Sequence, residues 1–302
     1  MNILIFGAGG FLGRALLPRL LNDGRVVRVT AVTHQKPLGI NLDTHKLACV
    51  TINDFFSPEA VSDRQSFDVV ICLCGRFYSH TSDEAIIKNS NLDIPVKIID
   101  HFRAVGTGHL ILASSINVRL LSESFRRGYP LYKKIVDDCL AASGLPYTIF
   151  RPALIFGSGD AGMSRLVRHI RKHSFVPVFG DGQKLEQPIH VEETADFFYQ
   201  AALSSPGNAV FEIGGLKAMT CDEMLLKIAS ALGRRVSLLH IPLKPIYLAL
   251  GFLERFGLGL PINSEQLLHI DTHLDIDNSP ALRRYDVTLR PFEELLSASY
   301  GF

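Results

Sequence analysis

Ser115, Tyr129 and Lys133 are the residues of this 302-residue chain whose types and spacing could perform acid–base chemistry. Tyr129 and Lys133 are four residues apart, so on a helix their side chains share one face. A tyrosine is a poor base at neutral pH because its ordinary pKa is about 10. A lysine ammonium within roughly 4–6 Å lowers that pKa, and a serine hydroxyl such as that of Ser115 can hold a substrate oxygen. The alternative is a helix whose tyrosine and lysine merely share a surface.

A glycine-rich turn at the start of the chain predicts a nucleotide site. The apolar run at residues 3–6 suits a buried strand, and Gly7, Gly10 and Gly13 lead from it into an expected helix. The first glycine permits the tight turn, the second lets the backbone approach a pyrophosphate, and the third lets helix pack on strand. The helix N-terminus then offers free N–H groups to the phosphates. The alternative is a tight turn without a ligand.

Alternating strands and helices must position these groups. Apolar runs predict strands at 26–33, 47–52, 68–73, 109–113 and 146–150, and helical periodicity marks 83–104 and 130–142. The alternation predicts an α/β fold with a doubly wound parallel sheet, in which chemistry occurs beyond the carboxyl ends of the strands. Further helices are expected at 163–173, 192–204, 221–232 and 245–256. We expect residues 1–157 and 186–214 to form the dinucleotide-binding (Rossmann) domain, and 158–185 and 215–302 a smaller C-terminal substrate-binding part.

Composition narrows the class of protein. A formal charge of +1 gives no reason to expect nucleic acid as a partner, and 47% apolar with 20% charged residues is typical of a globular chain. The apolar runs are shorter than the ~18 residues of a membrane-spanning helix. A strand beginning at residue 2 leaves no room for a signal peptide, and the five cysteines form no CxxC pair, so we expect a cytoplasmic protein with buried thiols. His169 and His173 lack an evident third ligand, so no metal is expected.

Together these motifs resemble the extended and atypical short-chain dehydrogenase/reductases, the NAD-dependent epimerase/dehydratase family. The glycine triplet, Ser115 and Tyr129-x-x-x-Lys133 carry the resemblance, with SGLPYTIFRPALIFG at 143–157 and HVEETA at 190–195 in register. The resemblance implies that Asn91 is the family's active-site asparagine and that Asp54 faces the adenine. It also implies an NAD(P)-dependent oxidoreductase or epimerase acting on a hydroxyl or carbonyl carbon of a small molecule, such as a sugar derivative.

The resemblance assigns a role to each candidate. Tyr129 is expected to be the general acid/base, Lys133 to tune it and hold the ribose, Ser115 to polarise the carbonyl and Asn91 to support the site. The expected cofactor contacts are Gly7, Gly9, Gly10, Phe11, Leu12, Gly13, Arg14, His34, Asp54, Cys74, Gly75 and Lys133.

The end of the second predicted strand favours NADP over NAD as the cofactor. NAD specificity usually comes from an Asp or Glu about 20 residues past the glycines, and residues 24–40 contain no carboxylate. His34 stands where a cation would attract a 2′-phosphate, and Arg14 could also reach it. The alternative is that Thr33 and His34 tolerate either ribose.

Two departures keep a second function open. Nucleotide-sugar enzymes of this family usually carry an arginine where this chain has Glu186. The Gln-Pro-Ile-His-Val sequence at 187–191 looks more like the atypical branch, which includes the accessory subunit of respiratory complex I. A nucleotide-binding redox sensor or assembly subunit without turnover is therefore the alternative. The apolar stretch 245–262 could be a lid, a membrane-surface contact or, as the default, core. The basic residues Arg165, Arg168, Arg171 and Lys172 could meet an anionic substrate or form a solvated face.

Overall fold

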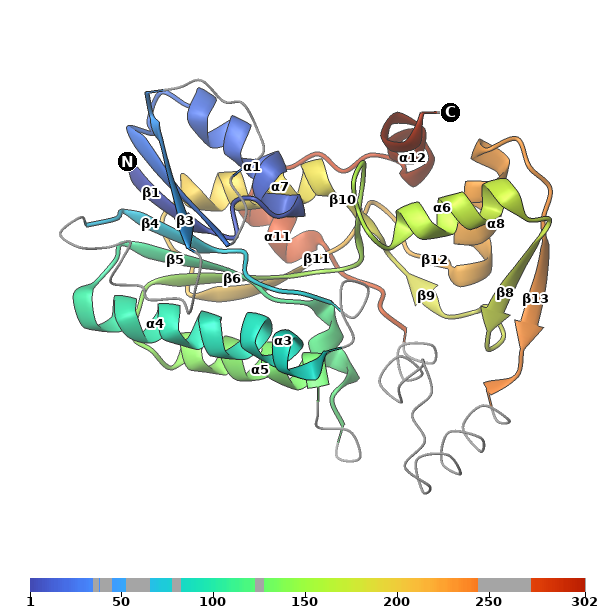
Figure 1. The fold of residues 1–302 in the computed structure, drawn as a ribbon, viewed down its shortest axis with the longest axis horizontal. Helices are drawn as coiled ribbons and strands as arrows, with labels where there is room; N and C mark the ends of the chain where they lie inside the picture. The colour runs from blue at the N-terminus through green and yellow to red at the C-terminus, as the bar shows by residue number, and fades with distance from the viewer. Residues whose placement is uncertain are drawn as a thin grey trace.

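A seven-stranded parallel sheet forms the centre of the computed structural model, which describes residues 1–34, 38, 45–52, 66–77, 83–122, 128–243 and 273–301 (Figure 1). The strand order is β11-β6-β5-β4-β1-β2-β3. Every pairing is parallel; Phe6, for example, lies opposite both Val32 and Cys72. The strands are β1 (Asn2–Phe6), β2 (Arg28–His34), β3 (Leu47–Ile52), β4 (Val69–Cys72), β5 (His109–Ala113), β6 (Tyr147–Pro152) and β11 (Ala209–Ile213). This sheet confirms the predicted fold class.

Helices cover both faces of the sheet (Figure 1). Helices α1 (Phe11–Asn22), α7 (Val191–Ala202) and α11 (Ser279–Arg284) lie on one face, and α3 (Glu84–Lys88), α4 (Ile94–Val105) and α5 (Gly128–Ala141) on the other. Successive side chains of β1 point to opposite faces of the sheet and so contribute to two hydrophobic cores. Ile3 and Ile5 pack under α1 and α7, whereas Leu4 and Phe6 pack under α4 and α5.

A π-helical turn interrupts the helix predicted at 83–104. Residues Asn89–Asp93 form this turn (η1) between α3 and α4. The local widening leaves Asn91 fully buried rather than on the helix surface. Such turns are often found at functional sites, and this one positions the predicted asparagine.

The remaining elements build a smaller unit around their own hydrophobic core. Its helices are α6 (Met163–Lys172), α8 (Cys221–Ala231) and α12 (Phe292–Tyr300), and its strands pair as β10 (Ile189–His190) with β7 (Ile155–Phe156), β12 (Met219–Thr220) with β9 (Leu185–Glu186), and β13 (Ser237–Ile241) with β8 (Phe175–Phe179). The helices predicted at 163–173, 192–204 and 221–232 are confirmed. The helix predicted at 245–256 and the apolar stretch 245–262 lie outside the described residues. In the described part of the chain, every helix is too short or too polar to cross a membrane.

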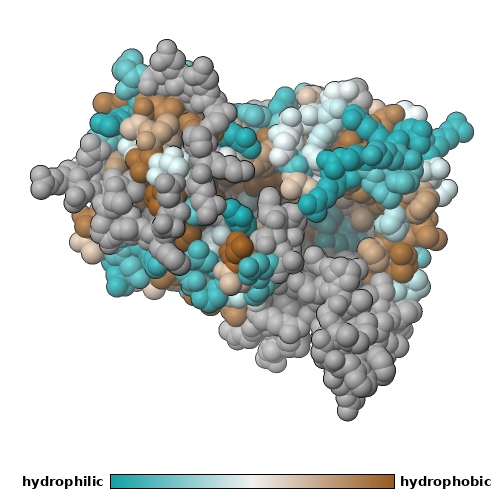
Figure 2. All heavy atoms as spheres, viewed as in Figure 1, coloured by the Kyte–Doolittle hydropathy of each residue, from teal (hydrophilic) through white to brown (hydrophobic). Residues whose placement is uncertain are grey.

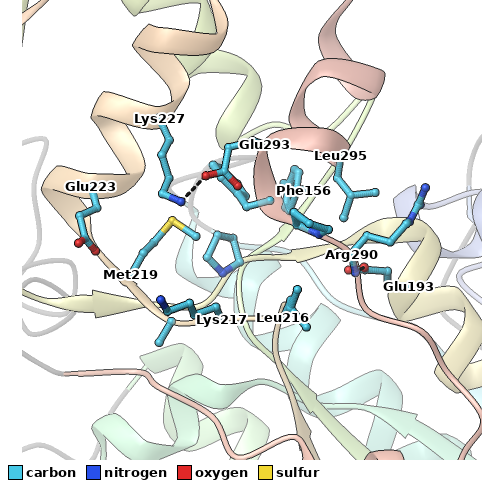
Figure 3. Close-up of a pocket in the computed structure, with 14 residues that line it drawn as sticks. Phe156, Glu193, Leu216, Lys217, Met219, Glu223, Lys227, Arg290, Glu293 and Leu295 are labelled. Atoms are coloured by element: carbon cyan, nitrogen blue, oxygen red, sulfur yellow. Dashed lines mark hydrogen bonds and ion pairs between the residues drawn. The ribbon is translucent and has the colours of Figure 1, made fainter.

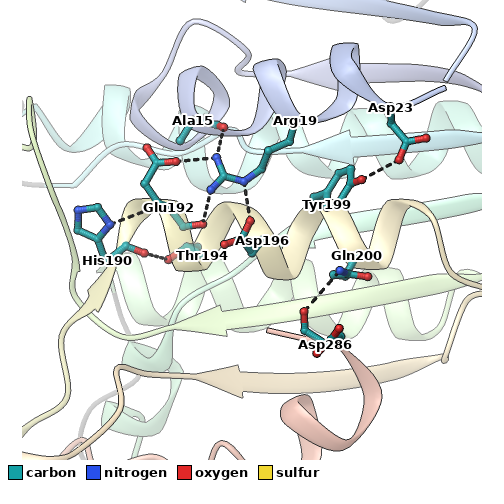
Figure 4. A network of polar contacts seen from close by, with 10 residues as sticks. All are labelled: Ala15, Arg19, Asp23, His190, Glu192, Thr194, Asp196, Tyr199, Gln200 and Asp286. Carbon is teal, nitrogen blue, oxygen red and sulfur yellow. Dashed lines mark hydrogen bonds and ion pairs between the residues drawn. The ribbon is translucent and has the colours of Figure 1, made fainter. Parts of the chain in front are cut away.

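Polar contacts tie α1, the helix that follows the glycine turn, to α7 (Figure 4). The Arg19 guanidinium donates to Asp196 Oδ1 and to Glu192 Oε2, each at 2.6 Å. At the far end of α1, the Tyr199 hydroxyl donates to Asp23 Oδ2 at 2.7 Å. These contacts join the C-terminal half of α1 to α7.

Candidate active site

The glycine turn has the backbone geometry of a ligand-binding loop. Gly7 adopts φ +81°, and a Cβ there would lie 3.1 Å from the Leu73 carbonyl group. A Cβ on Gly13 would lie 2.4 Å from the carbonyl oxygen of Ala8, so only glycine permits this packing. Among the described residues no side chain caps the start of α1, and its first turn has no acid. Its free N–H groups therefore suit an anion such as a pyrophosphate.

The other residues predicted to contact the cofactor near the turn differ in whether their side chains are exposed or buried. The Phe11 ring lies near Gly157, where a Cβ would be 3.4 Å from Phe11 Cζ. Leu12 is buried in the core, so only its backbone could contact a ligand. Arg14 is exposed on α1, as is His34 at the end of β2.

The first turn of the glycine loop lies beside the end of β2. A Cβ on Gly9 would be 3.2 Å from Thr33 Cγ2, and the Thr33 hydroxyl pairs with that of Thr51 at 3.2 Å. His34 therefore follows a residue that the loop contacts, which is the place where a ribose would be recognised.

Lys133 joins the carboxyl ends of two neighbouring strands. Its side chain is buried, and its ammonium donates to the carbonyl oxygens of Ala113 at 3.1 Å and Cys74 at 3.4 Å. A Cβ on Gly75 would lie 3.1 Å from Lys133 Nζ and 2.9 Å from Asn91 Oδ1. The predicted residues Gly75, Asn91 and Lys133 therefore converge at the edge where β4 and β5 end, close to the Leu73 carbonyl that faces the glycine turn.

Asn91 supplies a second indication that this edge receives a ligand. Its amide nitrogen donates to the carbonyl oxygens of Arg76 at 2.7 Å and Ile87 at 2.8 Å. Its Oδ1 is buried and has no hydrogen-bond partner within the ranges that the structure describes. Such an acceptor costs about 1–3 kcal/mol unless a donor meets it, so the residues here fit a cofactor or substrate that carries hydroxyl groups.

Tyr129 lies in the first turn of α5, half-buried over Lys133. The ammonium of Lys133 is 5.8 Å from the centre of the Tyr129 ring, and Phe77 meets that ring edge-on at 5.2 Å. The neighbouring Tyr132 instead donates its hydroxyl to Glu84 Oε1 at 2.8 Å. The structure thus brings Tyr129, rather than Tyr132, against the buried lysine.

Ser115 lies two residues after Ala113, the last residue of β5. The carbonyl oxygen of Ala113 is one of the two that Lys133 contacts. Ser115 is buried, and its Oγ accepts a hydrogen bond from the backbone N–H of Asn117 at 3.2 Å. This bond caps the 3-10 turn Ile116–Leu120 and fixes the serine at the strand end. A hydroxyl that already accepts one hydrogen bond can still donate its proton to a substrate oxygen.

Sequence reasoning missed a buried ion pair behind the lysine. Asp137 lies one turn after Lys133 on α5, and Arg151 Nε at the end of β6 donates to Asp137 Oδ2 at 2.8 Å. Burial raises the pKa of the Asp137 carboxyl, and the nearby Ser114, Arg151 and Lys133 oppose that shift. The four-residue spacing after Lys133 and the Arg-Pro sequence are the signals that could have indicated this pair.

Some predicted features stand apart from this edge. Asp54 lies outside the described residues. Glu186 forms an ion pair with Lys184 at 2.7 Å, so its carboxylate has a cationic partner. His169 contacts the Phe175 carbonyl oxygen at 3.1 Å, and the described residues contain no group of three or more metal-binding side chains.

A separate cavity of about 190 Å³ lies between α8, α12 and the loop at 216–218 (Figure 3). Apolar side chains such as Phe156 and Met219 line it, and Lys227 and Glu293 form an ion pair at one side. Arg290 and Glu223 point away from its centre. None of the predicted site residues lines this cavity, so we do not assign the chemistry to it.

Comparisons with known proteins show the family to which the chain belongs. A model of the NAD dependent epimerase/dehydratase family matches residues 3–214. The mitochondrial NADH dehydrogenase (ubiquinone) 1 alpha subcomplex subunit 9 of Arabidopsis thaliana is 26% identical over 231 residues, 73% of this chain and 55% of the plant protein, so the match spans about half of that relative. Ceramide reductase of Caulobacter vibrioides is 27% identical over 283 residues, 89% of this chain and 84% of that protein.

A solved structure shows the same fold. UDP-glucuronic acid 4-epimerase from Bacillus cereus, in complex with UDP-glucuronic acid and NAD, is similar with a TM-score of 0.72 at 17% identity. The likeness covers 99% of this chain and 98% of the epimerase.

Proposed function

Because this chain belongs to the NAD dependent epimerase/dehydratase family, we propose that it is an NAD(P)-dependent oxidoreductase or epimerase acting on a hydroxyl or carbonyl carbon of a small molecule. The convergence of Lys133, Asn91 and Gly75 beside Tyr129 carries this proposal. The site lies at the carboxyl edge of a parallel sheet, where ligands of such folds bind.

Each residue has a role that follows from its surroundings. Tyr129, whose ring centre lies 5.8 Å from the Lys133 ammonium, gives or takes the proton at the substrate oxygen. Ser115, held by its capping bond, donates a hydrogen bond to that oxygen. When bound, the nicotinamide cofactor supplies or accepts the hydride. The N–H groups at the start of α1 would hold its pyrophosphate, and Lys133 its ribose.

NADP(H) is the cofactor that the end of β2 favours within this proposal. His34 is exposed there, and residues 24–40 contain no carboxylate to repel a 2′-phosphate. Arg14 is exposed at the start of α1, where its positive charge would attract a 2′-phosphate. Both residues support a preference for NADP(H) over NAD(H), with modest discrimination.

The reaction is best tested against a panel of carbonyl and alcohol substrates. The relative named ceramide reductase supports including ceramides and the ketones derived from them. Nucleotide sugars are expected to bind weakly, because the position of the family's arginine holds Glu186, already paired with Lys184. Calorimetric titration of the cofactor-loaded protein with UDP- and dTDP-sugars tests this part, and micromolar binding of any of them would overturn it.

Cofactor binding tests the site without a known substrate. Lys133→Met should weaken NADPH binding at least about tenfold, because a hydrogen bond from a charged donor contributes roughly 1.5–3 kcal/mol. Lys134→Met is the matched control, since Lys134 is the next residue of α5 and pairs with Asp138 at 2.5 Å. Equal affinity in both variants, or no binding of either nicotinamide cofactor by the unaltered protein, would contradict the proposal.

A second candidate function has one observation behind it. The Arabidopsis thaliana relative is a subunit of NADH dehydrogenase, which favours a nucleotide-binding assembly subunit without turnover. That function predicts tight cofactor binding with no oxidation or reduction of any substrate in the panel. Turnover of one substrate that is lost when Tyr129 is replaced would support the enzyme and contradict the assembly subunit.

A further inference from the structure

Residues 74–77 leave the sheet after the end of β4 and contact α5 at two points. The Cys74 carbonyl oxygen accepts a hydrogen bond from Lys133 Nζ at 3.4 Å. Further along the same segment, the Phe77 ring lies 5.2 Å from the Tyr129 ring, and the two ring planes meet at 82°. Because Tyr129 and Lys133 are one turn apart on α5, the segment follows the helix face that carries both of these site residues.

The π-helical turn supplies a second anchor for this segment. The Asn91 side-chain amide donates hydrogen bonds to the Arg76 carbonyl oxygen at 2.7 Å and to the Ile87 carbonyl oxygen at 2.8 Å. Asn91 is fully buried, so it joins the segment firmly to α3 and η1. The backbone is therefore held on both sides of Gly75 and directly before Phe77, which fixes the point from which the Phe77 side chain extends.

Ring packing, rather than a hydrogen bond, holds Tyr129 against the other described residues. No hydrogen bond joins the Tyr129 hydroxyl to another residue within the ranges given for the structure, whereas the Tyr132 hydroxyl donates to Glu84 Oε1. The Tyr129 ring instead packs against Phe77 and lies 5.8 Å from the Lys133 ammonium. A perpendicular pair of aromatic rings is a preferred geometry, so this contact restricts how the phenol turns without engaging its hydroxyl.

The direction of the phenol matters because of where the proposed reaction occurs. The carboxyl ends of the sheet strands point toward the smaller unit (Figure 1), and the surface between the sheet and that unit is hollowed (Figure 2). Tyr129 is half-buried in the first turn of α5, beside these strand ends. A reacting group displaced by about 1 Å can lose roughly a hundredfold in rate, so a contact that orients the phenol affects turnover.

We propose that Phe77 is a positioning residue for Tyr129, and that its ring sets the direction in which the phenol meets the substrate oxygen. This inference rests on the proposed function, in which Tyr129 is the general acid/base. It gives Asn91 a further role, because the bond from Asn91 to the Arg76 carbonyl oxygen anchors the segment that carries Phe77. The effect of Phe77 on turnover passes through the Tyr129 hydroxyl.

A double-mutant cycle on the first substrate found tests this proposal. Phe77→Leu keeps an apolar side chain but removes the ring, so it should lower kcat about tenfold or more while NADPH affinity stays within about twofold. In the Tyr129→Phe background, the same substitution should lower the remaining kcat by less than about twofold. Equal losses in the two backgrounds would show that Phe77 acts independently of the hydroxyl and would overturn the proposal.

Two further variants separate the ring contact from a general effect on the fold. Phe77→Tyr retains the ring and should recover most of the kcat that Phe77→Leu loses. Phe175→Leu is the matched control, because Phe175 in the smaller unit also lies nearly perpendicular to a neighbouring ring, that of His169, at 6.2 Å. Its kcat should be unchanged. An equal loss in Phe77→Tyr, or in Phe175→Leu, would contradict the positioning role.

Fluorine NMR of 3-fluorotyrosine placed at position 129 follows the ring without turnover. Packing against Phe77 should give a broad fluorine signal in the unaltered protein, and Phe77→Leu should narrow that signal because the ring then moves more freely. Thermal denaturation checks folding, and Phe77→Met replaces Phe77→Leu if the leucine variant unfolds. An unchanged line width would contradict the positioning role alone, whereas full activity of Tyr129→Phe would contradict the proposed function.

Discussion

Lys133 Nζ lies 3.1 Å from the position that a Cβ on Gly75 would occupy. The same Cβ would lie 2.9 Å from Asn91 Oδ1, so an alanine at position 75 would push against two of the predicted site residues at once. Gly75 is exposed and its φ is not in the left-handed region, so the backbone itself accepts alanine. The position is therefore a sensitive probe of the site.

Gly75→Ala is expected to weaken cofactor binding while changing the free energy of unfolding by less than about 1 kcal/mol. The reason is that the methyl group displaces the tips of Lys133 and Asn91 without entering the core. Titration with NADPH and chemical denaturation measure the two effects. Gly24→Ala is the control, because a Cβ there meets nothing within 4 Å. Unchanged affinity in Gly75→Ala would place the ligand elsewhere.

His34→Asp is expected to shift cofactor preference from NADPH toward NADH. A carboxylate at the end of β2 repels a 2′-phosphate and accepts hydrogen bonds from a ribose diol, so the ratio of the two dissociation constants should change at least about tenfold. His34→Gln, which adds no charge, should change the ratio much less. Tighter binding of NADH than of NADPH by the unaltered protein would show that the preference was assigned wrongly.

His109 should make the protein sensitive to acid. Burial lowers the pKa of His109 to about 4, and its ring pairs with the Thr148 hydroxyl at 2.9 Å. The unfolded chain binds this proton near pH 6.5 and the folded chain only near 4, so stability is lost as the pH falls through that window. The contribution to the free energy of unfolding should fall by about 2 kcal/mol between pH 7 and pH 5.

His109→Gln should therefore lose less stability over the same pH range, as urea denaturation at both pH values would measure. His173→Gln, at an exposed position, provides the comparison. Parallel losses in the unaltered protein and His109→Gln would show that other groups cause the acid sensitivity.

Arg19→Ala should lower the free energy of unfolding by about 1–3 kcal/mol. The substitution removes two ion pairs, to Asp196 and Glu192, made by a guanidinium that is only 23% exposed between α1 and α7. Arg103→Ala is the matched control, because Arg103 is 62% exposed and its pair with Asp100 is 3.7 Å long. Equal effects of the two substitutions would mean that the α1–α7 contacts contribute no more than a surface pair.

The sheet was predictable because parallel strands are continuous apolar runs. The strands predicted at 47–52 and 109–113 have those bounds in the structure. The π-helical turn at Asn89–Asp93 was not predicted, because helical periodicity is nearly the same on both sides of it. The π-helical turn goes with tertiary packing, because Asn91 within it is buried beside the ends of the strands.

The residue types of the candidate site could be predicted from the sequence, but the contacts that position those residues could not. The spacing of Tyr129 and Lys133 fixes a shared helix face whatever the rest of the chain does. The pair of Asp137 with Arg151 depends on how α5 packs on β6, so the spacing after Lys133 and the Arg-Pro sequence could point to its members but not to their contact. The placement of Asn91 Oδ1 next to Gly75 likewise depends on three segments meeting at one edge.

Steady-state reduction and oxidation of a substrate panel, followed by NAD(P)H absorbance, tests the central claim most directly. With the first substrate found, Tyr129→Phe should lower the turnover rate by about 10²–10⁴-fold and leave cofactor affinity nearly unchanged, because the phenol acts in the proton transfer. Tyr132→Phe, which removes the hydroxyl that contacts Glu84, should remain active. Full activity of Tyr129→Phe on that substrate would contradict the assignment of Tyr129 as the general acid/base.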